Sequence, residues 1–316
     1  MLAATLAGPG LAAKLTEFEH TRIAEPRPAG VPSDAELEAS HALIGEIEIN
    51  VRDIFDESDR RENSGLYRLA DRLHVTTRPA EIRAQLLFRS GEPYVARKLA
   101  ETERNLRLLT YLYDARVVPV RFKDGKVDVR VTTKDVWTLS PGLSFGRTGG
   151  TNNSNANLLD SNILGTGKSL QFGHTVNVDR ISDGVSWSDP TVLGTRWTST
   201  LAYINSSDGY QRTLQVAHPF YSLDTRGAVN ILASTYDRTV SRYNLGNIVD
   251  QFNDDETSYE LSGGVSKGLE NGWVTRWTFG MRYDRNIGSC RRPSPRCRRC
   301  SCPRIALSRI PSSDST

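Results

Sequence analysis

Apolar and polar residues alternate along much of the chain between residues 137 and 286. In the clearest segment, Trp273, Trp277, Phe279, Met281 and Tyr283 alternate with arginine, threonine and glycine. A period of two is typical of a strand whose side chains point to two chemically different faces. The opposite positions are small, hydroxylic, amidic or charged, which favours a water-filled lumen over the solvent face of a packed sandwich. At roughly 10 residues per spanning strand plus turns, the pattern predicts about eight antiparallel transmembrane β-barrel strands.

Aromatic residues near the ends of these predicted strands support a membrane interpretation. Trp137, Trp197, Trp273 and Tyr283 lie where an amphipathic ring prefers the headgroup region of a bilayer. Alternation is a weak signal in any single strand, so a soluble antiparallel sandwich or a lipocalin-like barrel remains the alternative interpretation.

The region from residue 42 to 136 shows a different pattern, in which a strand, two helices and two strands follow one another. Pro79 opens the first helix and Gly91 ends it, and a period near 3.6 from Tyr94 to Leu112 predicts the second. The two strands that follow form a hairpin around Asp124-Gly125. The apolar positions of this hairpin are Val117, Val118, Val120, Phe122, Val127, Val129 and Val131.

Three segments carry a family resemblance. Residues 86–135, LLFRSGEPYVARKLAETERNLRLLTYLYDARVVPVRFKDGKVDVRVTTKD, resemble the polypeptide-transport-associated (POTRA) domain of the outer-membrane Omp85 superfamily. Residues 157–173, NLLDSNILGTGKSLQFG, are similar to the hairpin that joins the first two barrel strands there. Residues 218–228, HPFYSLDTRGA, resemble the family's proline-aromatic turn, and the branch is BamA/TamA-like, that of assembly factors and surface antigens. The hairpin motif positions are Asn162, Leu164, Gly165 and Gly167.

The resemblance implies a partial barrel with a POTRA-like domain in front of it, holding the first half of the family's barrel. It implies an outer-membrane assembly or translocation factor of the bacterial cell, with the POTRA-like domain in the periplasm. Unfolded β-rich clients, outer-membrane lipid and periplasmic accessory proteins would be the partners, without nucleic acid, cofactor or enzymatic chemistry. A client could add a strand by β-augmentation at Val117 to Phe122 or at Val127 to Val131.

The two ends of the chain differ in composition from the rest. The formal net charge is +3, but seven arginines and one acidic residue follow residue 288. All four cysteines, Cys290, Cys297, Cys300 and Cys302, lie in this tail. A frameshift or premature end explains the change best, with a zinc site or a basic arm as alternatives. Met1 to Leu15 could be a clipped signal peptide, and the residues that follow are rich in Pro, Ala and Glu.

These observations predict four parts: a possible signal and linker at 1–41, a POTRA-like domain at 42–136, a partial barrel at 137–286, and an aberrant or disordered basic tail at 287–316. No catalytic constellation or metal-ligand spacing is apparent. The Gly165 to Ser169 segment imitates a phosphate-binding loop, but Asn162 occupies a required glycine position and a strand follows. The acidic cluster at 250–256 is expected in a loop between strands. The alternative function is a soluble periplasmic or extracellular β-sandwich binding module with a basic tail.

Overall fold

The computed structural model describes residues 23–54, 75–148, 150–290 and 300–308. The possible signal peptide at Met1 to Leu15 and the tail residue Cys297 lie outside the described residues. The described residues form two compact units. The first holds 23–54, 75–140 and 160–168, and the second holds 141–148, 150–159, 169–290 and 300–308.

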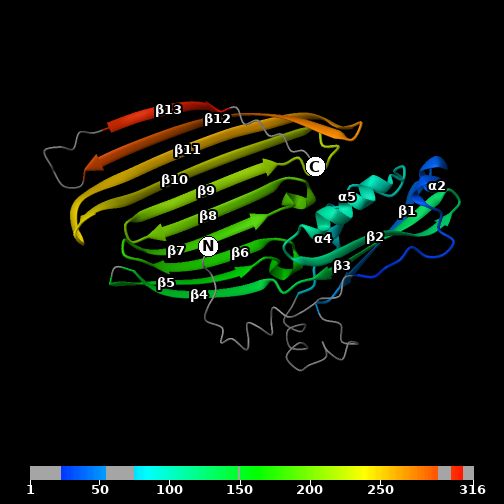
Figure 1. The fold of residues 1–316 in the computed structure, drawn as a ribbon, viewed down its shortest axis with the longest axis horizontal. Helices are drawn as coiled ribbons and strands as arrows, with labels where there is room; N and C mark the ends of the chain where they lie inside the picture. Colours follow the sequence, from blue (N-terminus) through cyan, green and yellow to red (C-terminus); the bar gives the residue numbers. More distant parts are fainter. Residues whose placement is uncertain (1–22, 55–74, 149, 291–299, 309–316) are drawn as a thin grey trace, which may run out of the picture. The chain divides into compact units, whose positions relative to one another are not determined.

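The first unit is an α+β unit in which the predicted order of strand, helix, helix, strand and strand is found. Its three-stranded sheet has the order β1-β3-β2, with β3 parallel to β1 and antiparallel to β2 (Figure 1). The elements are α2 (Asp34–Ala39), β1 (Leu43–Arg52), α4 (Pro79–Ala84), α5 (Ala96–Arg107), β2 (Leu112–Lys123) and β3 (Lys126–Asp135).

A closed hydrophobic core holds this unit together. Leu37 of α2, Ile82 of α4 and Leu106 of α5 are each fully buried in it. On the sheet side, Val127 and Val129 of the central strand β3 are also fully buried. Fully burying an aliphatic side chain stabilises a fold by about 1.5–3 kcal/mol, so these contacts dominate the stability of the unit.

Part of the segment predicted to be a linker is packed structure. Ser33 caps α2 through a capping box, in which the Ser33 backbone N–H donates to the Glu36 carboxylate at 2.7 Å. The Tyr94 hydroxyl donates to Asp34 of the same helix at 2.7 Å, and Leu37 enters the core. The linker prediction was therefore wrong for α2. It weighed proline and alanine content and missed the Ser-x-x-Glu capping signal.

The second unit contains an antiparallel sheet of ten described strands, arranged side by side in sequence order from β4 to β13 (Figure 1). Nine of these begin within 137–286, one more than the estimate of about eight. Among the described strands the order is open and does not close on itself. The strands are β4 (Leu139–Thr148), β5 (Thr151–Asp160), β6 (Ser169–Val176), β7 (Ile181–Asp189), β8 (Thr198–Ser206), β9 (Gly209–His218), β10 (Gly227–Asn244), β11 (Asn247–Glu270), β12 (Trp273–Cys290) and β13 (Cys300–Ser308).

Strands also occur where the sequence predicted none. β5 is rich in Asn and Ser, residues with low strand propensity, and this hid it from the pattern. The acidic cluster at 250–256 lies within β11 and not in a loop. Within the tail, β13 pairs antiparallel with β12, with Cys300 opposite Gly288. In the part of the chain that the structure describes, no helix has the length and apolar character needed to cross a membrane.

Candidate functional site

One side of the ten-stranded sheet, the apolar face, carries matched apolar side chains on neighbouring strands. Tyr259 lies opposite Tyr283, and Leu261 lies opposite Met281, across β11 and β12. Within the described part of the chain many of these side chains are largely exposed, and Phe279 is 59% exposed. The apolar face consists of Leu170, Phe172, Val185, Trp187, Leu201, Tyr203, Leu214, Val216, Val229, Ile231, Ala233, Tyr259, Leu261, Gly263, Val265, Trp277, Phe279, Met281 and Tyr283.

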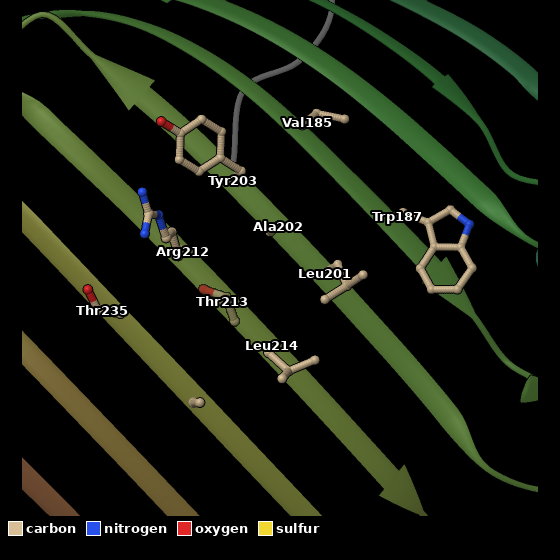
Figure 2. Close-up of a pocket in the computed structure, with 10 residues that line it drawn as sticks. Val185, Trp187, Leu201, Ala202, Tyr203, Arg212, Thr213, Leu214 and Thr235 are labelled. Atoms are coloured by element: carbon tan, nitrogen blue, oxygen red, sulfur yellow. The ribbon is translucent and has the colours of Figure 1, made fainter.

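The apolar face is shallowly hollowed over β7 to β10. Figure 2 shows Trp187, Leu201 and Leu214 on three neighbouring strands around this depression. Its volume is about 430 Å³, and Ala233 of β10 contributes only a methyl group to the lining. Because the lining is predominantly apolar, an acyl chain fits its chemistry better than water does.

Polar residues bound the apolar face at one end of the strands. His174 Nδ1 lies 2.7 Å from the Asp183 carboxylate there, and Asp237 lies opposite Asp255 on β11. From Trp273 to Tyr283, at about 3.4 Å per residue, the apolar positions of β12 extend over roughly 34 Å of strand.

The opposite side of the sheet, the polar face, is connected by hydrogen bonds between side chains. Gln215 donates to Asn230 at 2.8 Å, and Asn230 donates to Ser262 at 3.4 Å, linking β9, β10 and β11. Further along, the Tyr236 hydroxyl donates to Glu256 at 2.7 Å. A hollow of about 510 Å³ lies on this side, with hydroxyl, amide and guanidinium groups in its lining. The polar face therefore suits contact with water.

The hairpin motif residues form a turn that packs against residues 76–78 within the first unit. This turn, η1 (Ile163–Gly165), joins β5 to β6, which are the second and third described strands of the sheet. The Asn162 amide donates to the Thr77 hydroxyl at 2.7 Å, and its carbonyl oxygen accepts from the Gly167 N–H at 2.6 Å. Asn162 is 2% exposed, so both of these hydrogen bonds are shielded from water.

The two motif glycines permit close approach to Thr76 and Tyr111 of the same unit. The Gly165 carbonyl accepts from the Arg78 N–H at 2.8 Å. A Cβ at Gly165 would lie 2.3 Å from the Thr76 carbonyl oxygen, and one at Gly167 would lie 3.1 Å from the Tyr111 hydroxyl. Burial, with smaller contributions from nearby carboxylates, raises the pKa of Tyr111 well above its usual value. Leu164 points away from the contact region and is 62% exposed.

A second turn, η2 (Val192–Gly194), repeats the conformation of η1 between β7 and β8. In both turns the leucine has a φ of 53°, and the following glycine has a φ of 68° in η1 and 72° in η2. Sequence reasoning missed this repeat, although Asp-x-x-(Ile or Val)-Leu-Gly-Thr is visible at 160–166 and at 189–195. Unlike Gly165, Gly194 has open space around the position of a Cβ, and Leu193 is 94% exposed. The turn conformation is therefore encoded locally.

The structure separates the two sheet edges that were predicted to bind clients. Val127, Val129 and Val131 lie on β3, which pairs with β1 on one side and β2 on the other. The prediction of an edge there was wrong, because strand order depends on tertiary pairing that the local pattern does not reveal.

The other predicted segment lies on β2, at the end of the strand order. This strand carries Val117, Val118, Val120 and Phe122. Pro119 lacks a backbone N–H, and the Val117 N–H donates to the Glu103 carboxylate at 2.9 Å. Both features limit uncontrolled pairing at an edge strand.

A half-buried carboxylate on the central strand ties the three strands of the small sheet together. Asp128 on β3 accepts from the Glu46 N–H of β1 at 2.8 Å and from Arg121 of β2 at 2.6 Å. Desolvation opposes ionisation, but these two hydrogen bonds and the positive charge of Arg121 outweigh it and lower the pKa of Asp128. The ionised carboxylate is thus part of the folded state at neutral pH.

Among known proteins, the fold of this chain is similar to solved structures. No family model and no curated protein matches the sequence. The chain is similar to BamA from Haemophilus ducreyi lacking POTRA domains 1–3, with 12% identity, a TM-score of 0.43, and coverage of 77% of this chain and 51% of that one. It is also similar to CdiB from Acinetobacter baumannii, with 12% identity, a TM-score of 0.41, and coverage of 79% and 46%. Both are Omp85 superfamily members, and this chain spans about half the length of each.

Proposed function

We propose that this chain is the outer-membrane part of an Omp85-type assembly or translocation factor, whose POTRA-like α+β unit captures β-rich clients in the periplasm. The apolar face carries this proposal. Its side chains lie in register across neighbouring strands, while side chains of the polar face form hydrogen bonds with one another across β9, β10 and β11. An apolar surface of this extent is costly in water and stable against acyl chains.

The membrane part of the proposal is tested with tryptophan fluorescence. A variant that retains Trp277 alone, with the other four tryptophans changed to phenylalanine, is reconstituted into vesicles with brominated acyl chains. We expect strong quenching, because Trp277 is 64% exposed on the apolar face. As a matched control, a tryptophan introduced by Ser262→Trp on the polar face should be quenched far less. Weak quenching of Trp277 in a protein extracted without detergent would favour the soluble sandwich instead.

Client capture is assigned to β2, the predicted segment that lies at the edge of its sheet. An extended client pairs with the outward N–H and carbonyl groups of an edge strand. At Val117 the outward N–H is held by Glu103, which also forms ion pairs with Arg107 and Arg116. Glu103 therefore acts as a side-chain cap that a client strand has to displace.

Two substitutions with opposite expected effects test this assignment. Glu103→Ala frees the Val117 N–H and should raise the affinity for an unfolded β-rich client peptide several-fold, whereas Val117→Pro removes the donor and should lower it. Glu48→Ala is the matched control. Glu48 lies on β1, the opposite edge strand, and its carboxylate pairs with Arg130 of β3. Circular dichroism verifies folding. Equal client affinity in all three folded variants would eliminate β2 as the capture edge and leave the membrane proposal intact.

Periplasmic accessory proteins and barrel-assisted insertion of clients are the wider activities that this proposal includes. A cofactor has no part in it, because strand pairing and membrane insertion need no covalent chemistry. Reconstituted vesicles with and without the protein, incubated with an unfolded outer-membrane client, give the direct assay. Faster client folding in the protein-containing vesicles is the expected result.

A further inference from the structure

We propose that the turn between β9 and β10 forms a binding site for a phospholipid headgroup that carries both a phosphate and a primary ammonium group. This inference rests on the proposed membrane location. It concerns a pocket of about 590 Å³ at the strand ends. Its lining includes Trp197, His218, Tyr221, Asp224, Arg226 and Val229.

The pocket opens at the border of the apolar face. His218 is the register partner of Val229 of the apolar face, and the rings of Trp197 and His218 lie 5.5 Å apart. The next register pair along the strands, Val216 and Ile231, continues the apolar face. A ligand headgroup in the pocket can therefore extend an acyl chain over apolar side chains, which a free phosphate or soluble zwitterion cannot do.

Aromatic rings surround the space at this border. Tyr221 meets His218 edge to face at 5.5 Å, and the Arg196 guanidinium lies 4.8 Å from the centre of the Tyr221 ring. Rings with a polar edge favour the interface between acyl chains and water. The aromatic side chains thus match the depth of a lipid headgroup, and the Arg196 guanidinium covers one face of Tyr221.

Charges of both signs line the same pocket. Arg226 and Asp224 are exposed on the turn, two residues apart, and both belong to the lining. A guanidinium binds phosphate oxygens in a bidentate manner, and a carboxylate accepts hydrogen bonds from a primary ammonium. This pair favours a phosphoethanolamine headgroup over phosphoglycerol, which has no cation, and over phosphocholine, whose methylated ammonium cannot donate hydrogen bonds.

The turn is fixed in place before a ligand binds. On the polar face, the Phe220 ring packs on Gly264, where a Cβ would lie 2.8 Å from a ring carbon. The Arg276 guanidinium covers the same ring at 4.9 Å and donates to the Ser222 carbonyl at 3.3 Å. Anchoring on the opposite face leaves the pocket preformed, which lowers the entropic cost of binding.

Lipid retention measured by native mass spectrometry tests the site. The full chain is reconstituted into vesicles of equal phosphatidylethanolamine, phosphatidylglycerol and phosphatidylcholine content, then released in detergent. We expect retained phosphatidylethanolamine to exceed phosphatidylcholine by about tenfold, the magnitude of one hydrogen bond to a charged group. Arg226→Gln should reduce retention of both phosphatidylethanolamine and phosphatidylglycerol, and Asp224→Asn should shift preference from phosphatidylethanolamine to phosphatidylglycerol.

The control is Arg242→Gln, which removes an exposed arginine from the other end of β10 and should leave retention unchanged. If Trp277 is quenched by brominated lipid but all three lipids are retained equally, the headgroup site is overturned and the membrane location stands. Retention that falls equally in Arg226→Gln and Arg242→Gln would mean nonspecific attraction and would also overturn the site. Failure of Trp277 quenching removes the proposed function and this site together.

Discussion

The small sheet of the α+β unit and the ten-stranded sheet use similar β-branched, aliphatic and aromatic residues in opposite ways. Val129 of β3 is fully buried under helices, whereas Leu261 of β11 is 48% exposed on the apolar face. The apolar positions alternate in both strands, so alternation alone does not identify the medium that covers them. The opposite positions do: the polar face of the large sheet carries Gln215, Asn230 and Ser262 in a hydrogen-bonded row.

The largest expected effect comes from placing a charge in the closed core of the α+β unit. Val129→Asp places a carboxylate in a site with no exposed surface, and we expect it to destabilise the α+β unit by about 3–5 kcal/mol or prevent its folding. Chemical denaturation followed by circular dichroism, with Val129→Ala as the milder comparison, measures this loss. A Val129→Asp variant as stable as Val129→Ala would contradict a closed core.

A charge introduced on the apolar face should cause a smaller loss of stability, and the size of that loss should depend on whether lipid covers the face. Leu261→Arg should cost about 2–4 kcal/mol of stability in a bilayer, the value for arginine facing acyl chains near the midplane. Ser262→Arg is the matched control, because the neighbouring residue of β11 points to the polar face. Folding titrations in vesicles give both values. Equal losses in the two variants would show that lipid does not cover the apolar face.

The two copies of the turn allow a finer test of the contact between η1 and residues 76–78. Gly165→Ala and Gly194→Ala place a side chain at similar positive φ angles, which costs each about 1 kcal/mol. Gly165→Ala should lose at least ~1 kcal/mol more, because its Cβ would clash with the Thr76 carbonyl. Hydrogen exchange of the Arg78 amide, which donates to Gly165, reports the difference. Similar Arg78 exchange in both variants would contradict the docked contact.

The smallest expected effect is a pH dependence confined to the α+β unit. Because the pKa of Asp128 is lowered in the folded state, its contribution is fully present above its unfolded pKa of about 3.9. That contribution is lost as the pH falls through the lower folded value. Asp128→Asn should therefore lower stability at pH 7 and flatten the acid limb of the stability curve. Parallel acid limbs for the two proteins would disprove the role of Asp128.

Local sequence features predicted much of this fold. The helices at α4 and α5, the hairpin of β2 and β3, and most strands of the large sheet followed from periodicity, proline and glycine. Periodicity failed at β5, where Asn and Ser replace apolar residues, and at α2, whose main contribution to the core is Leu37.

The candidate site was less predictable, for physical reasons. The central place of β3 results from pairing with β1, whose residues lie some 80 positions earlier in the chain, as in Ile47 opposite Val129. No pattern within β3 records that contact. The docking of Asn162 on Thr77 likewise joins residues 85 positions apart. The headgroup pocket at Trp197 and Arg226 depends on how a turn folds beside a neighbouring strand.

The repeated turn has a consequence for how the first unit reaches its native packing. Because η2 adopts the η1 geometry with open space around Gly194, the backbone conformation of η1 does not depend on its contact with Thr76 and Arg78. Packing the turn against these residues therefore costs little additional chain entropy. The local sequence sets the shape of the turn, and the packing contact only has to recognise it.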